Sequence, residues 1–314
     1  VSGVRRCGKS VLIYQFLKDK KFGYVNFDDD RLLEVKPNDI LVAWYQIYGK
    51  KLPILFLDEI QNLEHWELFV NRLHRAGFQI FLTGSNAKLL AREMATHLTG
   101  RHRTLELFPF SFNEYLKAHQ FTEDLGTTQG RSMVLQHLQE YLLRGGFPEI
   151  VVKKEEHGAY LRELYQRVVE RDIVSRYHIA HQKTLKEIAR SVMSNPGRMV
   201  SLGKLRRQFG LGSDHTVKNY LSYLEEAYLI VFLKKFSFKP AEIERSEKKA
   251  YGIDTGMITT VSLQAGNEIT HLYENAVALE LLRRQSRHPE REIYYWKDAQ
   301  QEEVDFVVRE GKNV

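Results

Sequence analysis

The stretch Gly3-Val4-Arg5-Arg6-Cys7-Gly8-Lys9-Ser10 decides the fold, because it matches the pattern G-x-x-x-x-G-K-[ST] at every fixed position. In this pattern the glycines let backbone N–H groups converge on phosphate oxygens, the lysine reaches the β- and γ-phosphates, and the hydroxyl ligates Mg²⁺. A helical run over 11–17 follows, and its N-terminus adds partial positive charge to an anion site. The pattern therefore predicts binding of ATP with Mg²⁺. The expected contact residues are Gly3, Arg5, Arg6, Gly8, Lys9, Ser10 and Val11.

The second half of the expected site is an apolar run over 52–57 that is followed by Asp58 and Glu59. The run is too short for a helix and is rich in β-branched and aromatic residues, so it predicts a strand buried on both faces. Open parallel sheets bind ligands at the carboxyl ends of their strands. We expect Asp58 to hold Mg²⁺ together with Ser10, and Glu59 to act as general base on the attacking water. Carboxylates that merely cap the next helix are the alternative.

A third strand is expected over 78–82, and small polar residues follow it. A P-loop ATPase places a group that senses the γ-phosphate at this point. Thr83, Ser85 and Asn86 are all chemically suited to that role, and we favour Ser85 or Asn86. An ordinary strand-to-helix turn with Ser85 as N-cap is the alternative.

Two arginines that follow a helix expected over 87–96 are candidates for an arginine finger. Arg101 or Arg103 would stabilise transition-state charge, either in its own subunit or on a neighbouring one. A solvated basic turn is the alternative. We take Arg101 as the candidate, and we expect it to act in catalysis together with Lys9 and Glu59.

Length and composition describe a globular protein of two to three domains. The chain has 314 residues, of which 43% are hydrophobic and 27% charged, and it shows no apolar run near the length of a membrane span. The lack of a long apolar run gives no reason to expect a membrane partner. The single cysteine, Cys7, excludes an internal disulfide and favours a reducing, cytoplasmic setting. The net charge of +6 is compatible with a nucleic-acid partner. Only two residues precede the phosphate loop, which normally follows a buried strand, so we expect the chain to continue beyond both ends.

Four regions differ in their sequence pattern. Residues 1–112 alternate strand-like and helical runs, which is typical of an α/β domain with a parallel sheet. Residues 113–182 read as helices, interrupted by a turn at 144–148, and predict a helical lid or connector. We expect a winged helix-turn-helix over 183–240 and a further α/β domain over 241–314.

The expected helix-turn-helix consists of helices over 184–193 and 201–210 and a third that begins near residue 213. Ser213 or Asp214 would cap this third helix, and the run 228–236 would supply a wing strand. Winged helices bind either DNA or proteins, and both remain candidate partners. The residues expected to face a DNA groove are His215, Lys218 and Asn219, and those near phosphates are Lys204, Arg206 and Arg207.

In the last region a helix is expected over 272–284 and strands over 249–254, 292–297 and 302–309. Glu274 on the helix and Asp305 on the final strand match two metal-binding positions of a PD-(D/E)xK nuclease. Such a site also needs a following strand with Glu-x-Lys, and the given sequence ends before one could appear. Asp305 as a charge at a strand edge is the alternative.

Further motifs occur in a characteristic order along the chain. They are L-D-E-I-Q at 57–61, L-T-G-S-N at 82–86, L-T-G-R at 98–101, R-G-G-F-P at 144–148, D-T-G-M at 254–257, Y-E-N-A-V at 273–277 and E-V-D-F-V-V at 303–308. Together with the phosphate loop they resemble the prokaryotic AAA+ ATPases in which an AAA domain is followed by a domain of unknown function, DUF4143. Val4 stands where this loop frequently has proline.

The resemblance implies an ATP-binding N-terminal domain, a winged-helix middle and a C-terminal part like restriction endonucleases. By position, Lys9, Ser10, Asp58 and Glu59 match the nucleotide site, while Glu274 and Asp305 match part of the nuclease-like core. The leading hypothesis is a Mg²⁺-dependent ATPase whose nucleotide state controls the winged-helix and nuclease-like module. A nucleotide-gated DNA-binding switch and an ATP-regulated nuclease are the alternatives. Many relatives in the AAA+ superfamily assemble into rings, so an oligomer is a candidate assembly.

Overall fold

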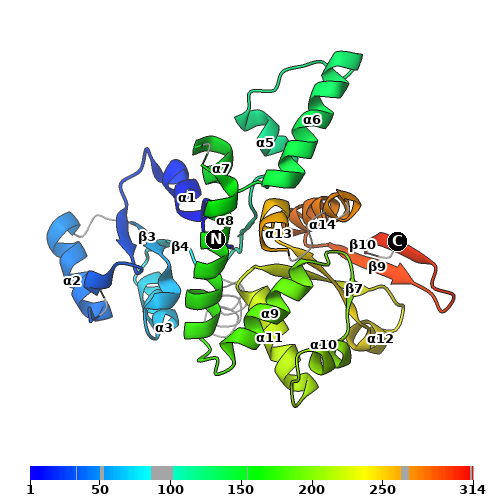
Figure 1. Ribbon diagram of the computed structural model, residues 1–314. Coiled ribbons are helices and arrows are strands. Elements are labelled where there is room, and N and C mark those ends of the chain that lie inside the picture. Colours follow the sequence, from blue (N-terminus) through cyan, green and yellow to red (C-terminus); the bar gives the residue numbers. More distant parts are fainter. Residues whose placement is uncertain are drawn as a thin grey trace. The chain divides into compact units, whose positions relative to one another are not determined.

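Two compact units make up the chain in the computed structural model, which describes residues 1–32, 34–49, 53–85, 102–153, 155–262, 269–311 and 313 (Figure 1). The first unit consists of Val1–Gly3 and Gly8–Leu107, and the second of Val4–Cys7 and Phe108–Val314. The sensor candidate Asn86, the finger candidate Arg101 and the helix expected over 87–96 lie outside the described residues.

A parallel sheet forms the centre of the first unit, in the order β2 (Gly23–Asn26), β3 (Ile54–Asp58) and β4 (Gln79–Leu82). Every residue of β3 is buried, which confirms the strand expected before Asp58 and Glu59. Strand β1 (Ser2–Gly3) pairs in parallel with β5 (Glu106–Leu107), and Ser2 also forms a bridge with Gly84 just after β4. The phosphate loop therefore begins at the same edge of the sheet at which β3 and β4 end.

Helices cover both faces of β3, because successive side chains of a strand point to opposite sides. Ile54 and Phe56 pack against Ile13 and Leu17 of α1 (Lys9–Leu17). Leu55 and Leu57 instead lie in a cluster with the aromatic residues of α2 (Pro37–Tyr48) and α3 (Trp66–Arg75). Trp66 is 3% exposed in that cluster, so its side chain serves in packing. The members from these two helices include Trp44, Trp66 and Phe69.

The second unit begins with a helical region. Its elements are α5 (Phe112–Ala118), α6 (Thr128–Arg144), α7 (Pro148–Lys153), α8 (His157–Arg167) and the π-helical segment η4 (Val168–Ser175). The turn expected at 144–148 separates α6 from α7. Gly145 has φ 81° there, and a Cβ at this position would lie 2.1 Å from the Asp254 carboxylate. A glycine is therefore required both by the backbone and by the space.

The three helices and two strands expected next are present, together with the short elements β6 and α12. They are α9 (Gln182–Met193), β6 (Met199–Val200), α10 (Leu202–Gln208), α11 (Asp214–Glu226), β7 (Ile230–Lys235), α12 (Pro240–Arg245) and β8 (Lys248–Gly252). Ser213 caps α11, since its Oγ accepts a hydrogen bond of 3.2 Å from the Thr216 N–H. The short helix α12 was not anticipated from the sequence.

The remaining elements are α13 (Thr255–Val261), α14 (Ile269–Arg287), β9 (Arg291–Lys297) and β10 (Glu303–Glu310). A five-stranded mixed sheet has the order β10-β9-β7-β8-β6, in which only β7 and β9 pair in parallel. Leu233, Tyr251 and Tyr295 from three of its strands lie in one core cluster with Ala278 of α14. None of the helices in the described ranges is both long and apolar enough to cross a membrane.

Candidate nucleotide-binding site

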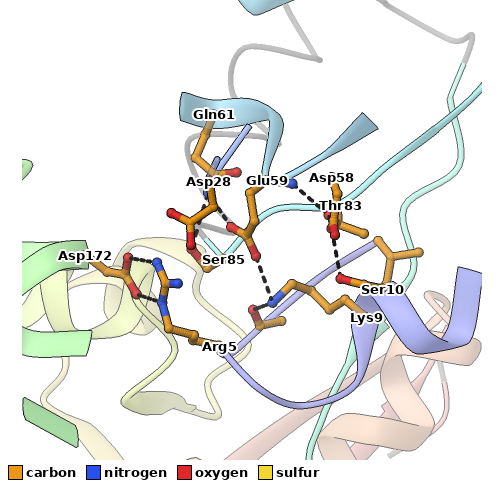
Figure 2. A network of polar contacts seen from close by, with 12 residues as sticks. Arg5, Lys9, Ser10, Asp28, Asp58, Glu59, Gln61, Thr83, Ser85 and Asp172 are labelled. Carbon is orange, nitrogen blue, oxygen red and sulfur yellow. Dashed lines mark hydrogen bonds and ion pairs between the residues drawn. The ribbon is translucent and has the colours of Figure 1, made fainter. Parts of the chain in front are cut away.

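The lysine of the phosphate loop lies folded back on its own loop in the first unit (Figure 2). Lys9 Nζ donates a hydrogen bond of 3.1 Å to the Gly3 carbonyl and lies 3.8 Å from Glu59 Oε1. Its side chain is only 3% exposed. Gly8, just before it, has φ 99°, a left-handed conformation that suits glycine and allows the sharp entry into α1. The ammonium is thus close to both the loop backbone and the candidate base.

Asp58 and Ser10 form the candidate magnesium site. Ser10 Oγ donates a hydrogen bond of 2.9 Å to Asp58 Oδ1, and the Tyr24 hydroxyl donates one of 3.1 Å to Oδ2. The Thr83 hydroxyl also donates to Oδ1 of this carboxylate. Burial, with the neighbouring Asp58 charge, raises the pKa of Tyr24, so the phenol stays a donor. A buried carboxylate beside a serine hydroxyl fits the oxygen ligands that Mg²⁺ prefers.

Glu59 leaves the line of β3, because its backbone is left-handed with φ 51°. Non-glycine residues rarely adopt this conformation, and it often marks a functional turn. Hydrogen bonds to two neighbours fix the turn. The Glu59 N–H donates a hydrogen bond of 2.9 Å to Thr83 Oγ1, and Gln61 Nε2 donates one of 2.6 Å to Glu59 Oε2. The carboxylate is thereby directed to the same place as Lys9. A carboxylate so placed is chemically able to accept a proton from water.

Gln61 and Thr83 also contact the carboxylates of the site, although neither was among the residues favoured from the sequence. Thr83 is fully buried and contacts both Asp58 and Glu59, whereas Ser85 contacts Gln61 Nε2 at 3.4 Å. The signal for Thr83 was its place directly after β4, although Ser85 and Asn86 were the favoured sensor candidates. Gln61 had no such signal, because only the turn η3 (Ile60–Asn62) brings its amide back to Glu59.

The two loop arginines are paired with carboxylates in the second unit, to which Val4–Cys7 also belongs. Arg5 binds Asp172 of η4 through two hydrogen bonds of 3.0 and 3.1 Å, and Asp172 is 3% exposed (Figure 2). Arg6 Nη1 lies 3.1 Å from Glu149 Oε1. Val11 projects an exposed side chain from α1. Asp172 could not be connected with the loop from local sequence patterns, because 167 residues separate it from Arg5.

The structure brings Glu274 and Asp305 together, but around a lysine. The buried Nζ of Lys249 on β8 lies 3.2 Å from Glu274 Oε1, 2.5 Å from Glu303 Oε1 and 2.7 Å from Asp305 Oδ1. Burial opposes the charge, but these three carboxylates outweigh it and raise the pKa of Lys249 to about 12. No group of three or more His, Cys, Asp or Glu side chains in the described part of the chain is arranged to hold a metal ion.

Comparison with known families matches three segments of the chain. An AAA domain model matches residues 1–116, a domain of unknown function, DUF8612, matches 135–268, and DUF4143 matches 270–314. The uncharacterized protein MJ1544 of Methanocaldococcus jannaschii is 36% identical over 322 residues, which cover 98% of this chain and 71% of that protein. The chain belongs to the AAA-domain ATPases that carry a DUF4143 domain. The resemblance in the sequence motifs is thus confirmed.

Another relative in this AAA–DUF4143 family is an uncharacterized protein of Haemophilus influenzae, 30% identical over 338 residues that cover all of this chain and 80% of the relative. Among solved structures, the Walker-type ATPase PABY2304 of Pyrococcus abyssi shares the fold, with a TM-score of 0.50 at 13% identity over 83% of this chain and 89% of that one. The AAA domain of the family binds nucleotide, and membership suggests ATP hydrolysis.

Proposed function

We propose that the chain is a Mg²⁺-dependent ATPase whose reaction takes place between the phosphate loop and the end of β3. The observation that carries the proposal is the contact of 2.9 Å between Ser10 Oγ and Asp58 Oδ1, with Lys9 Nζ and Glu59 Oε1 only 3.8 Å apart at the same sheet edge. These four side chains provide the magnesium ligands, the phosphate-binding cation and the base that ATP hydrolysis needs.

In this mechanism the protein mainly positions groups and compensates charge. Lys9 exchanges its hydrogen bond with Gly3 for phosphate oxygens, while Ser10 and Asp58 hold Mg²⁺. The bound ion supplies charge neutralisation for the transferred phosphoryl group. Glu59 accepts the proton of the attacking water, and Gln61 and Thr83 hold Glu59 in its left-handed turn. Asn86 and Arg101 stay proposals as γ-phosphate sensor and arginine finger.

Glu59→Gln tests this assignment. We expect the variant to retain ATP affinity within about threefold and to lose at least about 100-fold in kcat, the scale of general-base catalysis. Lys9→Ala should instead lose ATP affinity. Glu64→Gln is a matched control, since Glu64 is an exposed carboxylate a few residues away with its side chain 89% exposed. Steady-state phosphate release and equilibrium ATP binding separate the two effects, and undiminished turnover by Glu59→Gln would show that the base is another group.

A second candidate function is nucleotide-gated binding of duplex DNA by α9–α11 and β7, taken as a winged helix. Basic side chains on α10 and on the N-terminal half of α11 favour DNA binding. The exposed ones include Lys204, Arg207, His215 and Lys218. We expect duplex affinity to fall steeply with salt, to change with ATP, and to weaken in Lys218→Ala. Affinity that is the same with and without ATP would exclude the switch, and no duplex binding would favour a protein partner.

A nuclease controlled by the ATPase is the least favoured alternative. It draws support from Glu274 on α14 and Asp305 on β10, the arrangement of a restriction-endonuclease-like core. Against it stands Lys249, whose ammonium lies between these carboxylates where a metal ion would be needed. Mg²⁺-dependent plasmid cleavage that disappears in Asp305→Ala would reverse this ranking.

A further inference from the structure

A pocket of about 480 Å³ lies in the second unit, lined by residues from the end of β7, from α12 and from the end of β9. Parallel pairing of Lys235 with Tyr295 brings the two strand ends together, and the Phe236 N–H donates a hydrogen bond of 2.6 Å to the Tyr295 carbonyl. Phe236 and Trp296 are thereby fixed in the pocket wall. The volume is within the range of small-molecule sites, about 300–1,000 Å³.

An aromatic side chain stands open to solvent at this pocket. Phe238 is 87% exposed, the highest value for a large hydrophobic side chain in the described part of the chain. It is nevertheless oriented, because its ring meets that of Phe236 edge-on with centroids 5.1 Å apart, and Phe236 meets Tyr294 in the same way at 5.7 Å. Trp296 supplies a second, partly exposed aromatic surface. An oriented aromatic ring with exposed faces is suited to stacking against a planar ligand.

The charge of the pocket lining is predominantly positive. Lys235, Arg245 and Lys297 line it, whereas Glu242 is the one carboxylate of the lining. The Glu242 carboxylate accepts a hydrogen bond of 2.8 Å from Ser237 Oγ and forms an ion pair of 3.0 Å with Lys239 Nζ. Lys297 is paired with Glu303 at 3.1 Å. Within the described ranges, neither Lys235 nor Arg245 forms an ion pair, although Lys235 is near enough to Glu242 to contribute to its lowered pKa, so both cations are available to an anion.

We propose that this pocket binds one nucleotide of a single-stranded nucleic acid, with the base stacked on Phe238 and Trp296 and the phosphate held by Arg245 and Lys235. An arginine fork matches phosphate geometry, and aromatic rings stack on any base. A duplex does not fit this chemistry, because its bases are already stacked on one another. An acidic peptide would use the cations but not the aromatic faces. The inference rests on residues of the second unit alone and does not depend on ATP hydrolysis.

The test is fluorescence anisotropy of a labelled ten-nucleotide oligo(dT) with the full chain, in EDTA and without ATP. Phe238→Ala should weaken binding about tenfold, as expected for the loss of one stacked base, whereas Phe238→Trp should restore it. Tyr45→Ala is the matched control, because Tyr45 is an exposed aromatic residue in the first unit. Arg245→Ala should reduce the slope of log Kobs against log salt by about 0.7, and Arg75→Ala, an exposed arginine on α3, should not.

Two further ligands make the outcome decisive. An abasic strand of equal length keeps the phosphates and lacks the bases, so we expect it to bind more weakly than oligo(dT) and to be insensitive to Phe238→Ala. Oligo(dT) should also quench the fluorescence of Trp296, since the other tryptophans, Trp44 and Trp66, are buried in the first unit. Equal affinity for the abasic strand, tighter binding of a duplex, or equal competition by poly-glutamate would overturn the proposal.

Discussion

Asp254 is a buried carboxylate that holds two segments of the second unit together. It caps α13, where its Oδ1 accepts a hydrogen bond of 2.9 Å from the Met257 N–H, and its Oδ2 accepts one of 2.7 Å from the Gly146 N–H. Complete burial raises the pKa of Asp254 to about 6, although these backbone N–H groups oppose the shift. The turn after α6 is thus fixed by a group whose charge depends on pH.

The stability of the protein should reflect this titration. The carboxyl of Asp254 ionises near pH 3.8 in the unfolded chain but only near pH 6 in the folded one, so the folded state binds the extra proton between these values. Its contribution to the free energy of unfolding therefore falls as pH rises from about 4 to 6, by up to about 3 kcal/mol. Urea unfolding of wild type and Asp254→Asn at several pH values in this range measures that contribution. The other carboxylates are the same in both proteins, so their effects cancel in the difference between the two free energies of unfolding. A difference that is constant with pH would contradict the shifted pKa.

At the scale of elements, Lys249 joins β8, α14 and β10 through its three carboxylate partners. Glu274 also accepts a hydrogen bond of 2.9 Å from the Tyr251 hydroxyl. The buried ammonium compensates charge that would otherwise repel among Glu274, Glu303 and Asp305. The cluster is only partly shielded from solvent, since the side chain of Glu274 is 18% exposed and that of Asp305 is 55% exposed.

Lys249→Met should destabilise the chain by about 2–3 kcal/mol. This is less than the cost of breaking a fully buried ion pair, because Asp305 is half exposed. Lys248→Met is the control, since Lys248 belongs to the same strand but lies over the Phe232 ring, 5.6 Å from its centroid. We further expect Mn²⁺ to raise the melting temperature of Lys249→Met by more than that of wild type, since both proteins share the candidate magnesium site at Ser10 and Asp58. Equal stabilisation of both proteins by Mn²⁺ would show that the lysine does not replace a metal ion.

Elements with a strong local pattern could be predicted from the sequence, whereas those fixed by tertiary contacts could not. The run before Asp58 could be assigned because β3 is apolar at every position and is buried on both faces. The start of α11 could be predicted because Ser213 is a residue type that caps helices. By contrast, α12 has only six residues, and η4 continues α8 with a π-helical hydrogen-bond pattern that hydrophobic spacing does not reveal.

At the scale of the whole molecule, the order of motifs was sufficient to recognise the family but not the contacts between distant segments. Lys9, Ser10, Asp58 and Glu59 could be named as a site because each follows a local pattern. The partners of Arg5 and Lys249 could not, because Asp172 lies 167 residues from the first and Asp305 lies 56 residues from the second. Pairings of this kind depend on how the chain folds back, which composition and spacing do not encode.

The pairing of β1 with β5 has a consequence for synthesis on the ribosome. The strand that leads into the phosphate loop finds its partner only about a hundred residues later, at Glu106 and Leu107. At about 5–20 residues per second, a nascent chain waits about 5–20 s between the emergence of the two strands. Until β5 has emerged, only the contacts of Val1 and Ser2 with Leu82 and Gly84 hold the start of the loop, so full nucleotide affinity should arise late in translation, after most of the sheet has already formed.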